Sequence, residues 1–230
     1  MSIDSICFKM KEVLEVVTPL HLSTKRDYLG RMIDDKVNCM KIAKKYDHEY
    51  WDGSRRFGYG GYKYIPDRWK PVAEALIKKY KLSEDSSVLD IGCGKAYLLY
   101  EMKKILPGLR VTGFDISVHG LEKALDPIKE NLFIHSAKDP LSFDDQEFDL
   151  AISLGCFHNL QLIDLETAFS EISRVSKNQY VMVESFRNES ELFNLQCWAL
   201  TCESFLSPEE WQYFASNNNY HGDFEFIYFE

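Results

Sequence analysis

The stretch SVLDIGCGKAYLL, residues 87–99, decides the fold of this chain. It opens with a short apolar run that suits a buried parallel strand, and Gly92-Cys93-Gly94 ends that run. Apolar residues at helical spacing follow at once and continue to Leu106. The order strand, glycine turn, helix is the first unit of an α/β sheet, whose ligand site lies beyond the carboxyl end of the strand.

The residues around this turn limit the ligand. A dinucleotide fingerprint, G-x-G-x-x-G, needs a small residue at its last position, where this chain has Tyr97, so an NAD-dependent oxidoreductase is a disfavoured alternative. A phosphate-binding P-loop would need G-K-[ST] after the turn, and the chain has none there. Asp90 places a carboxylate just before the glycines. A carboxylate there repels a pyrophosphate and suits an ammonium or sulfonium group.

The string VLDIGCGKA, residues 88–96, resembles the first motif of the class I S-adenosylmethionine (SAM) dependent methyltransferases (type 11-like), (V/L)LD-x-G-C-G-x-G. The resemblance implies a Rossmann-like, doubly wound α/β fold with a mostly parallel sheet. It also implies that Asp90 and the turn Gly92-Cys93-Gly94 receive the amino-acid end of SAM. Ala96 replaces the last glycine of the motif, and we expect it to add a methyl group near the methionine moiety in an ordinary backbone conformation.

The next two predicted strands supply the rest of the cofactor site. The second ends in Asp115, 25 residues after Asp90, about where a nucleotide-binding unit places a carboxylate for ribose hydroxyls. In the family this acid holds the ribose of SAM and the next residue, here Ile116, packs on adenine. The alternative for Asp115 is an N-cap of the following helix. The third strand ends at Ser136 and Ala137, where the resemblance places the adenine and Ser136 replaces the usual acid by a weaker hydrogen bond.

Four side chains are candidates for handling a proton of the methyl acceptor. The fourth predicted strand ends at Leu154, a cofactor-site residue, and is followed by His158, which could accept a proton at neutral pH. Glu184 ends the fifth strand and could pair with a substrate amine, or it is a solvated strand end. Tyr59 and Tyr62 complete the set. Methyl transfer from a sulfonium is an SN2 reaction that gains most from alignment, so no obligatory triad is expected.

Residues 50–64, YWDGSRRFGYGGYKY, combine aromatic rings with glycines and basic side chains. One interpretation is a lid over the substrate and the methionine end of SAM, with Arg55, Arg56 or Lys63 available for an acidic group. The other is a loop packed on the core by its aromatic rings. We call residues 50–64 the lid segment.

Helical patterns surround this segment. We expect an amphipathic helix within residues 1–22, stopped by Pro19, and a second over residues 24–46, opened by a capping box and buried along one apolar face. Further helices should begin near residue 70 and after Ser207.

The chain divides at residue 82 on these patterns. Residues 1–82 are predicted to form a helical N-terminal cap that includes the lid segment. Residues 83–230 are predicted to form the SAM-binding core.

Composition excludes several classes of protein. The chain has 230 residues and a formal net charge of −9, and eight acids but no Lys or Arg follow Arg187. Because nucleic-acid binding needs a basic stripe, a DNA or RNA methyltransferase is disfavoured. The six scattered cysteines lack a C-x-x-C pair, and no apolar run approaches ~18 residues. We therefore expect a cytoplasmic protein with no metal site, no membrane segment and no nucleic-acid partner, and we leave its oligomeric state open.

Two longer stretches refine the function. GYGGYKYIPDRWKPVAEAL and ESFRNESELFNLQCWALTCESFLSPEEW are similar to a bacterial methyltransferase subgroup associated with polysaccharide and nonulosonic-acid gene clusters. The resemblance implies methyl transfer from SAM to a nitrogen or oxygen of a small polar metabolite, such as an acidic amino sugar of the nonulosonic-acid type. A non-catalytic SAM-binding sensor or partner subunit is the alternative.

Overall fold

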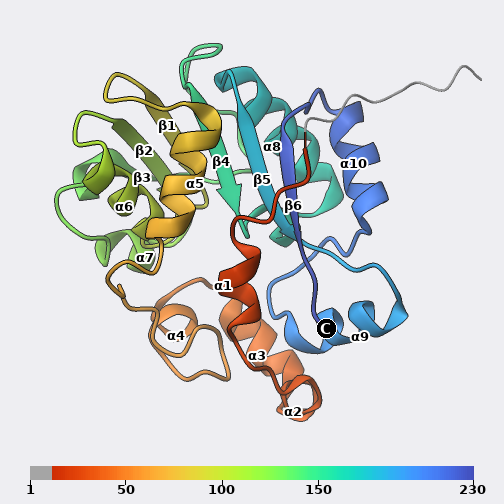
Figure 1. The fold of residues 1–230 in the computed structure, drawn as a ribbon. Coiled ribbons are helices and arrows are strands. Elements are labelled where there is room, and N and C mark those ends of the chain that lie inside the picture. Colours follow the sequence, from red (N-terminus) through yellow and green to blue (C-terminus); the bar gives the residue numbers. More distant parts are fainter. Residues whose placement is uncertain (1–11) are drawn as a thin grey trace, which may run out of the picture.

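The computed structural model describes residues 12–230, and a six-stranded sheet runs through its centre (Figure 1). The strands are β1 (Ser87–Ile91), β2 (Arg110–Asp115), β3 (Leu132–Ile134), β4 (Leu150–Leu154), β5 (Gln179–Glu184) and β6 (Asp223–Ile227). They pair in the order β3-β2-β1-β4-β5-β6, and every pairing is parallel. The strand order reverses between β1 and β4, so the ligand crevice of a doubly wound sheet is expected there. The predicted Rossmann-like fold is confirmed.

Helices cover both faces of this sheet, which explains why its strands read as continuous apolar runs. Val88 of β1 packs in a core with α5 (Lys70–Tyr80) and α6 (Tyr97–Ile105). Its neighbour Leu89 points to the other face, in a core with α8 (Leu162–Val175) and α10 (Pro208–Asn217). The starts of α5 near residue 70 and of α10 after Ser207 are confirmed, and Ser207 and Glu210 form a capping box.

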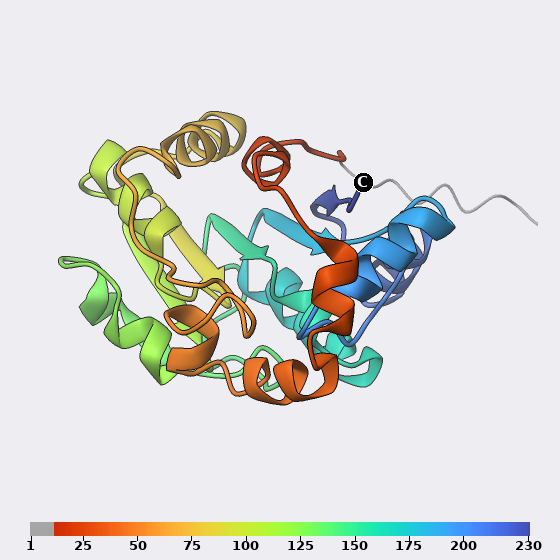
Figure 2. The same cartoon turned by 90° about the horizontal axis from the view of Figure 1, so that it is seen from below.

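The remaining helices gather mainly at the carboxyl edge of the strands (Figures 1 and 2). They are α1 (Thr18–Leu22), α2 (Tyr28–Ile33), α3 (Lys36–Ala43), α4 (His48–Trp51), α7 (Val118–Glu122), α9 (Glu189–Trp198), and the 3₁₀ turns η1 (Lys129–Asn131) and η2 (Phe157–Asn159). Among residues 12–230, no helix has the length and apolar character needed to cross a membrane.

The first predicted helix is wrong in the part that the structure describes. Val13 forms a parallel bridge with Phe224 of β6, and Pro19 lies in the first turn of α1 instead of ending a helix. The fully buried carboxylate of Glu225 fixes this arrangement, because it accepts hydrogen bonds from the N–H groups of residues 16–18 at 2.6–3.0 Å. The part of this predicted helix before residue 12 lies outside the described residues.

The second predicted helix is two short ones. Asp27 caps α2 by accepting from the Gly30 N–H at 2.9 Å, and Asp35, with φ 43°, separates α2 from α3. The apolar face that we expected to be buried is largely exposed: Leu29 61%, Met32 39%, Ile33 83% and Val37 64%. Helical spacing thus located apolar residues that this protein leaves on its surface.

Candidate active site

The glycine turn closes against the two strands beside β1. The N–H groups of Gly92 and Cys93 donate to the Phe114 carbonyl of β2 at 2.9 and 3.0 Å. Gly92 has φ 76°, and a Cβ on it would lie 2.5 Å from the Cβ of Cys156, just after β4. Only glycine fits a position that combines left-handed backbone with such a close approach. The turn therefore lies at the β1/β4 switch point, where the strand order predicts a ligand.

Ala96 corrects one expectation from the sequence. Its backbone is left-handed, with φ 53°, whereas we expected an ordinary conformation. An L-residue pays about 1 kcal/mol for this geometry. Its methyl group is 1% exposed and belongs to the core beneath α5 and α6, so the substitution fills the core instead of adding a methyl group to the cofactor crevice.

Two buried carboxylates lie near the carboxyl ends of the paired strands β1 and β2, beside the turn. Asp115 accepts from the N–H of Gly94 at 2.8 Å and from the N–H of Ser117 at 2.8 Å. Asp90 is 4% exposed, and its carboxylate accepts no hydrogen bond from residues 12–230. Burial and the charge of Asp115 raise the pKa of Asp90 to about 8. A cationic ligand group beside Asp90 would stabilise its charged form. The two carboxylates therefore fit the sulfonium and ammonium charges of SAM.

Asp115 is not the N-cap of the following helix, α7. The hydroxyl of Ser117, not Asp115, caps α7 by accepting from the Gly120 N–H at 2.9 Å. Asp115 instead holds the glycine turn and the start of α7 through its two backbone hydrogen bonds.

The other predicted cofactor residues lie along the same carboxyl edge of the sheet. Ile116 follows β2 and is 50% exposed, so its side chain is available to a flat ring. Ser136 and Ala137 follow β3, and Leu154 ends β4. Sequence reasoning gave no role to His135, whose Nε2 atom is buried and has no partner among the described residues. The residue before Ser136 thus carries a ring nitrogen that no described group satisfies.

The lid segment lies directly on the glycine turn. A Cβ on Gly94 would lie 2.6 Å from the Trp51 ring, and the Trp51 indole N–H donates to the Ser117 hydroxyl at 2.7 Å. The Tyr59 ring stacks on Trp51 with centroids 5.2 Å apart, and Tyr62 contacts both rings. Aromatic side chains of residues 50–64 therefore form the wall over the turn.

An ion-pair network that sequence reasoning missed fixes this wall. Lys95, in the variable position of the motif, is 3% exposed and donates to both Asp52 carboxylate oxygens at 2.7 and 2.8 Å. Its ammonium also donates to the Tyr62 carbonyl at 2.7 Å, and His119 Nε2 lies 2.8 Å from Asp52. One buried lysine thus connects the glycine turn to two points of the lid segment. Nothing in the motif indicated that this lysine would be buried.

The predicted proton-handling residues differ in what their surroundings allow. His158 is 4% exposed, and its Nδ1 accepts from the Glu184 N–H at 3.1 Å, which places the proton of the neutral ring on Nε2. Nε2 lies 3.6 Å from the Glu184 carboxylate. Burial lowers the pKa of His158 against the opposing effect of Glu184. His158 is therefore a neutral donor with no free lone pair, whereas the Glu184 side chain is 23% exposed.

The two candidate tyrosines differ in their exposure and in their neighbours. Tyr59 is 44% exposed, and burial raises its pKa, with a further rise from the charge of Glu184. Tyr62 stacks on Tyr97 with centroids 5.2 Å apart, and burial raises its pKa. A hydroxyl with a raised pKa stays protonated at neutral pH, so Tyr62 is a hydrogen-bond donor.

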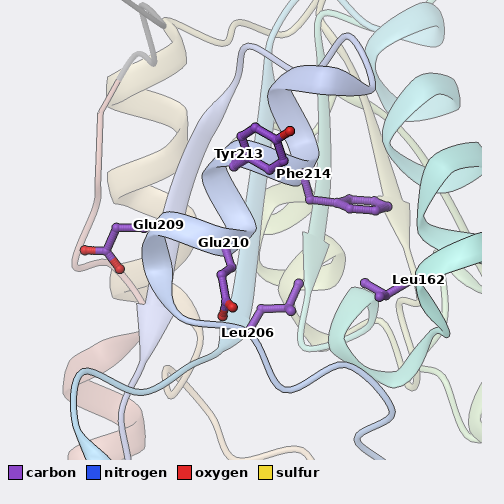
Figure 3. A pocket seen from close by; sticks show the side chains of 6 residues that line it. All are labelled: Leu162, Leu206, Glu209, Glu210, Tyr213 and Phe214. Atoms are coloured by element: carbon purple, nitrogen blue, oxygen red, sulfur yellow. The ribbon is translucent and has the colours of Figure 1, made fainter.

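A groove lies between the start of α8 and α10 (Figure 3). It is lined by Leu162, Leu206, Glu209, Glu210, Tyr213 and Phe214. None of these residues belongs to the predicted site.

Comparisons with known proteins agree with this geometry. A family model described as a methyltransferase domain matches residues 82–221. The mitochondrial arginine-hydroxylase NDUFAF5 of Mus musculus is 29% identical over 119 residues, which cover 51% of this chain and 34% of that protein. Demethylmenaquinone methyltransferase of Chlorobaculum tepidum is 32% identical over 114 residues, covering 49% of this chain and 46% of that protein. The chain thus spans between a third and a half of the length of these two relatives.

Solved structures share the fold. The complex of the Haloferax volcanii Trm112 methyltransferase activator with a methyltransferase matches with a TM-score of 0.51 and 19% identity, over 67% of this chain and 77% of that chain. Geranyl diphosphate C-methyltransferase of Streptomyces coelicolor, solved with Mg²⁺, geranyl diphosphate and S-adenosyl-L-homocysteine, gives 0.51 and 18% identity, over 64% and 58%. The family model covers more than half of the chain, and the fold agrees with it. The chain therefore belongs to the methyltransferase domain family.

Proposed function

We propose that the protein methylates a nitrogen or oxygen of a small polar metabolite that binds between the lid segment and the end of β5. The observation that carries this proposal is the pair formed by Glu184 and His158 at that strand end. A partly exposed carboxylate there lies 3.6 Å from a neutral imidazole whose proton is on the facing nitrogen. This pair is suited to accept a proton from an acceptor amine or hydroxyl.

The cofactor end of the site is assigned to residues of the carboxyl edge. When bound, SAM supplies a methyl group on a positively charged sulfur. We assign its amino-acid end to Asp90 and the turn Gly92-Cys93-Gly94, and its ribose to Asp115. The adenine is assigned to Ile116 and to residues 136, 137 and 154. Support comes from the two buried carboxylates near the ends of β1 and β2, where burial and the charge of Asp115 raise the pKa of Asp90, and from the exposed Ile116 side chain.

Glu184 is the proposed proton acceptor, and His158 is the residue that positions it. An amine acceptor must be neutral to attack, and a hydroxyl must lose its proton, so a carboxylate at the rim is useful in both cases. Tyr59 faces the same side and donates a hydrogen bond to the acceptor, whereas Tyr62 closes the wall on the cofactor side. The acceleration then comes mainly from holding the nucleophile in line with the methyl group.

The remaining predictions about the whole protein stay predictions. We propose that residues 1–82 act as a cap whose lid segment excludes water from the reaction, that the substrate is a small acidic amino sugar, and that the protein is cytoplasmic with no nucleic-acid partner. The relatives named above act, by their names, on arginine, a menaquinone precursor and geranyl diphosphate, so similarity alone does not select an acceptor.

A transfer assay tests the proposal. Purified protein is incubated with SAM carrying an isotope-labelled methyl group and with host metabolite extract, and mass spectrometry follows the label. We expect a labelled small molecule, and we expect Glu184→Gln to lower its formation at least about tenfold while leaving SAM affinity in calorimetry unchanged. SAM binding without any labelled product would instead support the non-catalytic sensor or partner subunit. Binding of NAD but not of SAM would refute the cofactor assignment.

A further inference from the structure

Three arginines surround one tryptophan at the carboxyl edge of the sheet. The guanidinium carbons of Arg26, Arg31 and Arg55 lie 5.6, 4.5 and 5.2 Å from the centroid of the Trp198 ring. They come from the segment before α2, from α2 and from the lid segment, while Trp198 ends α9. We call Arg26, Arg31 and Arg55 the arginine cluster.

The positive charge of this cluster is not neutralised by ion pairs. None of its three members forms one with a carboxylate of residues 12–230. Arg31 donates to the Arg55 and Arg56 carbonyls at 2.9 and 2.7 Å, and Arg55 donates to the Gly58 carbonyl at 2.8 Å. Arg26 Nε is buried and has no acceptor in the described part of the chain. By contrast, the nearby Arg56 pairs with Asp34 at 2.8 Å.

Further positive charge lies beside the cluster. Lys36 donates to the carbonyls of Cys197 and Ala199, on either side of Trp198, at 2.7 and 2.6 Å. Burial, followed by the charge of Arg31, lowers the pKa of Lys36 to about 8. Burial also lowers the pKa of Arg31, and Arg55 adds to that effect. Like charges held together at partial burial destabilise the folded protein unless an anion joins them.

The cluster adjoins the proposed acceptor site. Arg55 also donates to the carbonyl of Tyr59 at 3.2 Å, and the Tyr59 ring stacks over Trp51 on the glycine turn. Burial lowers the pKa of Arg26 and of Lys36, and the charge of Glu184 opposes this effect in both. A molecule that presents its nucleophile to Glu184 would therefore extend toward the cluster.

We propose that Arg26, Arg31 and Arg55 bind an oxyanion, a carboxylate or a phosphate, carried by the methyl acceptor. This inference rests on the proposed function, since it gives the acceptor its charge and its orientation. Guanidinium groups bind such oxyanions through paired N–H donors, and the stacking on Trp198 holds their planes in place. In a chain of net charge −9, a local excess of cations is a specific feature and not a consequence of composition.

Calorimetry with two simple probes, inorganic phosphate and citrate, tests the inference at constant ionic strength. The variants are Arg31→Gln and Arg26→Gln, the second because Arg26 donates only to residues 21 and 24 and forms no hydrogen bond with the lid segment. Arg110→Gln is the matched control, since Arg110 is an exposed arginine at the opposite end of β2. SAM is titrated into each preparation as the test of folding and of cofactor binding.

We expect the wild type and Arg110→Gln to bind at least one probe equally well, and each cluster variant to bind it about tenfold more weakly with unchanged SAM affinity. The tighter probe tells whether the acceptor carries a carboxylate or a phosphate. Equal affinity in all four proteins, or no binding of either probe by the wild type, overturns the inference while SAM binding leaves the methyltransferase assignment intact. If the wild type does not bind SAM, the proposed function itself is refuted.

Discussion

Replacing Asp52 by asparagine tests how the lid segment is held on the glycine turn. Asp52 receives two hydrogen bonds from Lys95, at 2.7 and 2.8 Å, and one contact from His119 at 2.8 Å. Asparagine is nearly isosteric with aspartate, so the substitution removes charge with little change of shape. Lys95 then keeps the Tyr62 carbonyl as its acceptor but loses its counter-ion.

The magnitude follows from the burial of the two partners. Breaking a fully buried ion pair costs about 3–5 kcal/mol, and an exposed pair contributes under about 1 kcal/mol. Lys95 is 3% exposed and Asp52 is 22% exposed at the side chain, so the pair lies between these limits. We expect the free energy of unfolding to fall by about 2 kcal/mol. The Lys70–Glu74 pair, 3.9 Å apart and with side chains 48% and 56% exposed, serves as the control. Glu74→Gln should change the free energy of unfolding by less than about 0.5 kcal/mol.

The assay is guanidinium unfolding combined with limited proteolysis within residues 50–64. Hydrogen bonds from Lys95 and His119 lower the pKa of Asp52 although burial opposes them. Its stabilising effect is therefore present above its ordinary pKa of 3.8 and is lost as the pH falls through the lower folded value. The wild type and Asp52→Asn should differ at neutral pH and converge in acid. Equal unfolding free energies at neutral pH, with equal cleavage of the lid segment, would show that Lys95 does not hold it.

Three further substitutions are informative. Glu225→Gln should lower the free energy of unfolding by about 3 kcal/mol in denaturant titrations, because the buried carboxylate accepts three backbone N–H groups and the Thr18 hydroxyl. Gly94→Ala should increase proteolysis of the lid segment, because its Cβ would lie 2.6 Å from Trp51; an unchanged cleavage pattern would refute this packing. Asp90→Asn should weaken SAM binding in calorimetry by about tenfold or more. Because the folded pKa of Asp90 is raised from 3.8 to about 8, the wild type should lose stability as the pH rises between these two values in urea titrations, and Asp90→Asn should lose less.

The part of the fold that repeats a strong local pattern could be predicted from the sequence. The strand before Gly92 and the strand that ends at Glu184 have the bounds that their apolar patterns indicate. Ser207 caps the start of α10, as the capping residues in the sequence indicate. These elements depend on local chemistry that tertiary packing does not oppose.

The N-terminal part could not be predicted, because distant contacts decide it. The run around Val13 has helical spacing, but β6 offers an edge and Glu225 offers a carboxylate that fixes the chain before Thr18. Neither partner is visible in a local window, since both lie more than 200 residues away in the sequence. The same reason applies to Lys95, whose burial depends on the fold of the lid segment over it.

The charges left without ion pairs suggest why the site is built as it is. Asp90 is buried beside Asp115 with no hydrogen bond to its carboxylate from residues 12–230, and the arginine cluster stands around Trp198 without a carboxylate partner in that range. Each arrangement costs folding free energy, so neither is explained by stability. The ligand pair proposed above, a cationic cofactor at the glycine turn and an anionic acceptor at the cluster, would account for both arrangements. Such an acceptor would bind with its anion toward the cluster and its nucleophile toward Glu184.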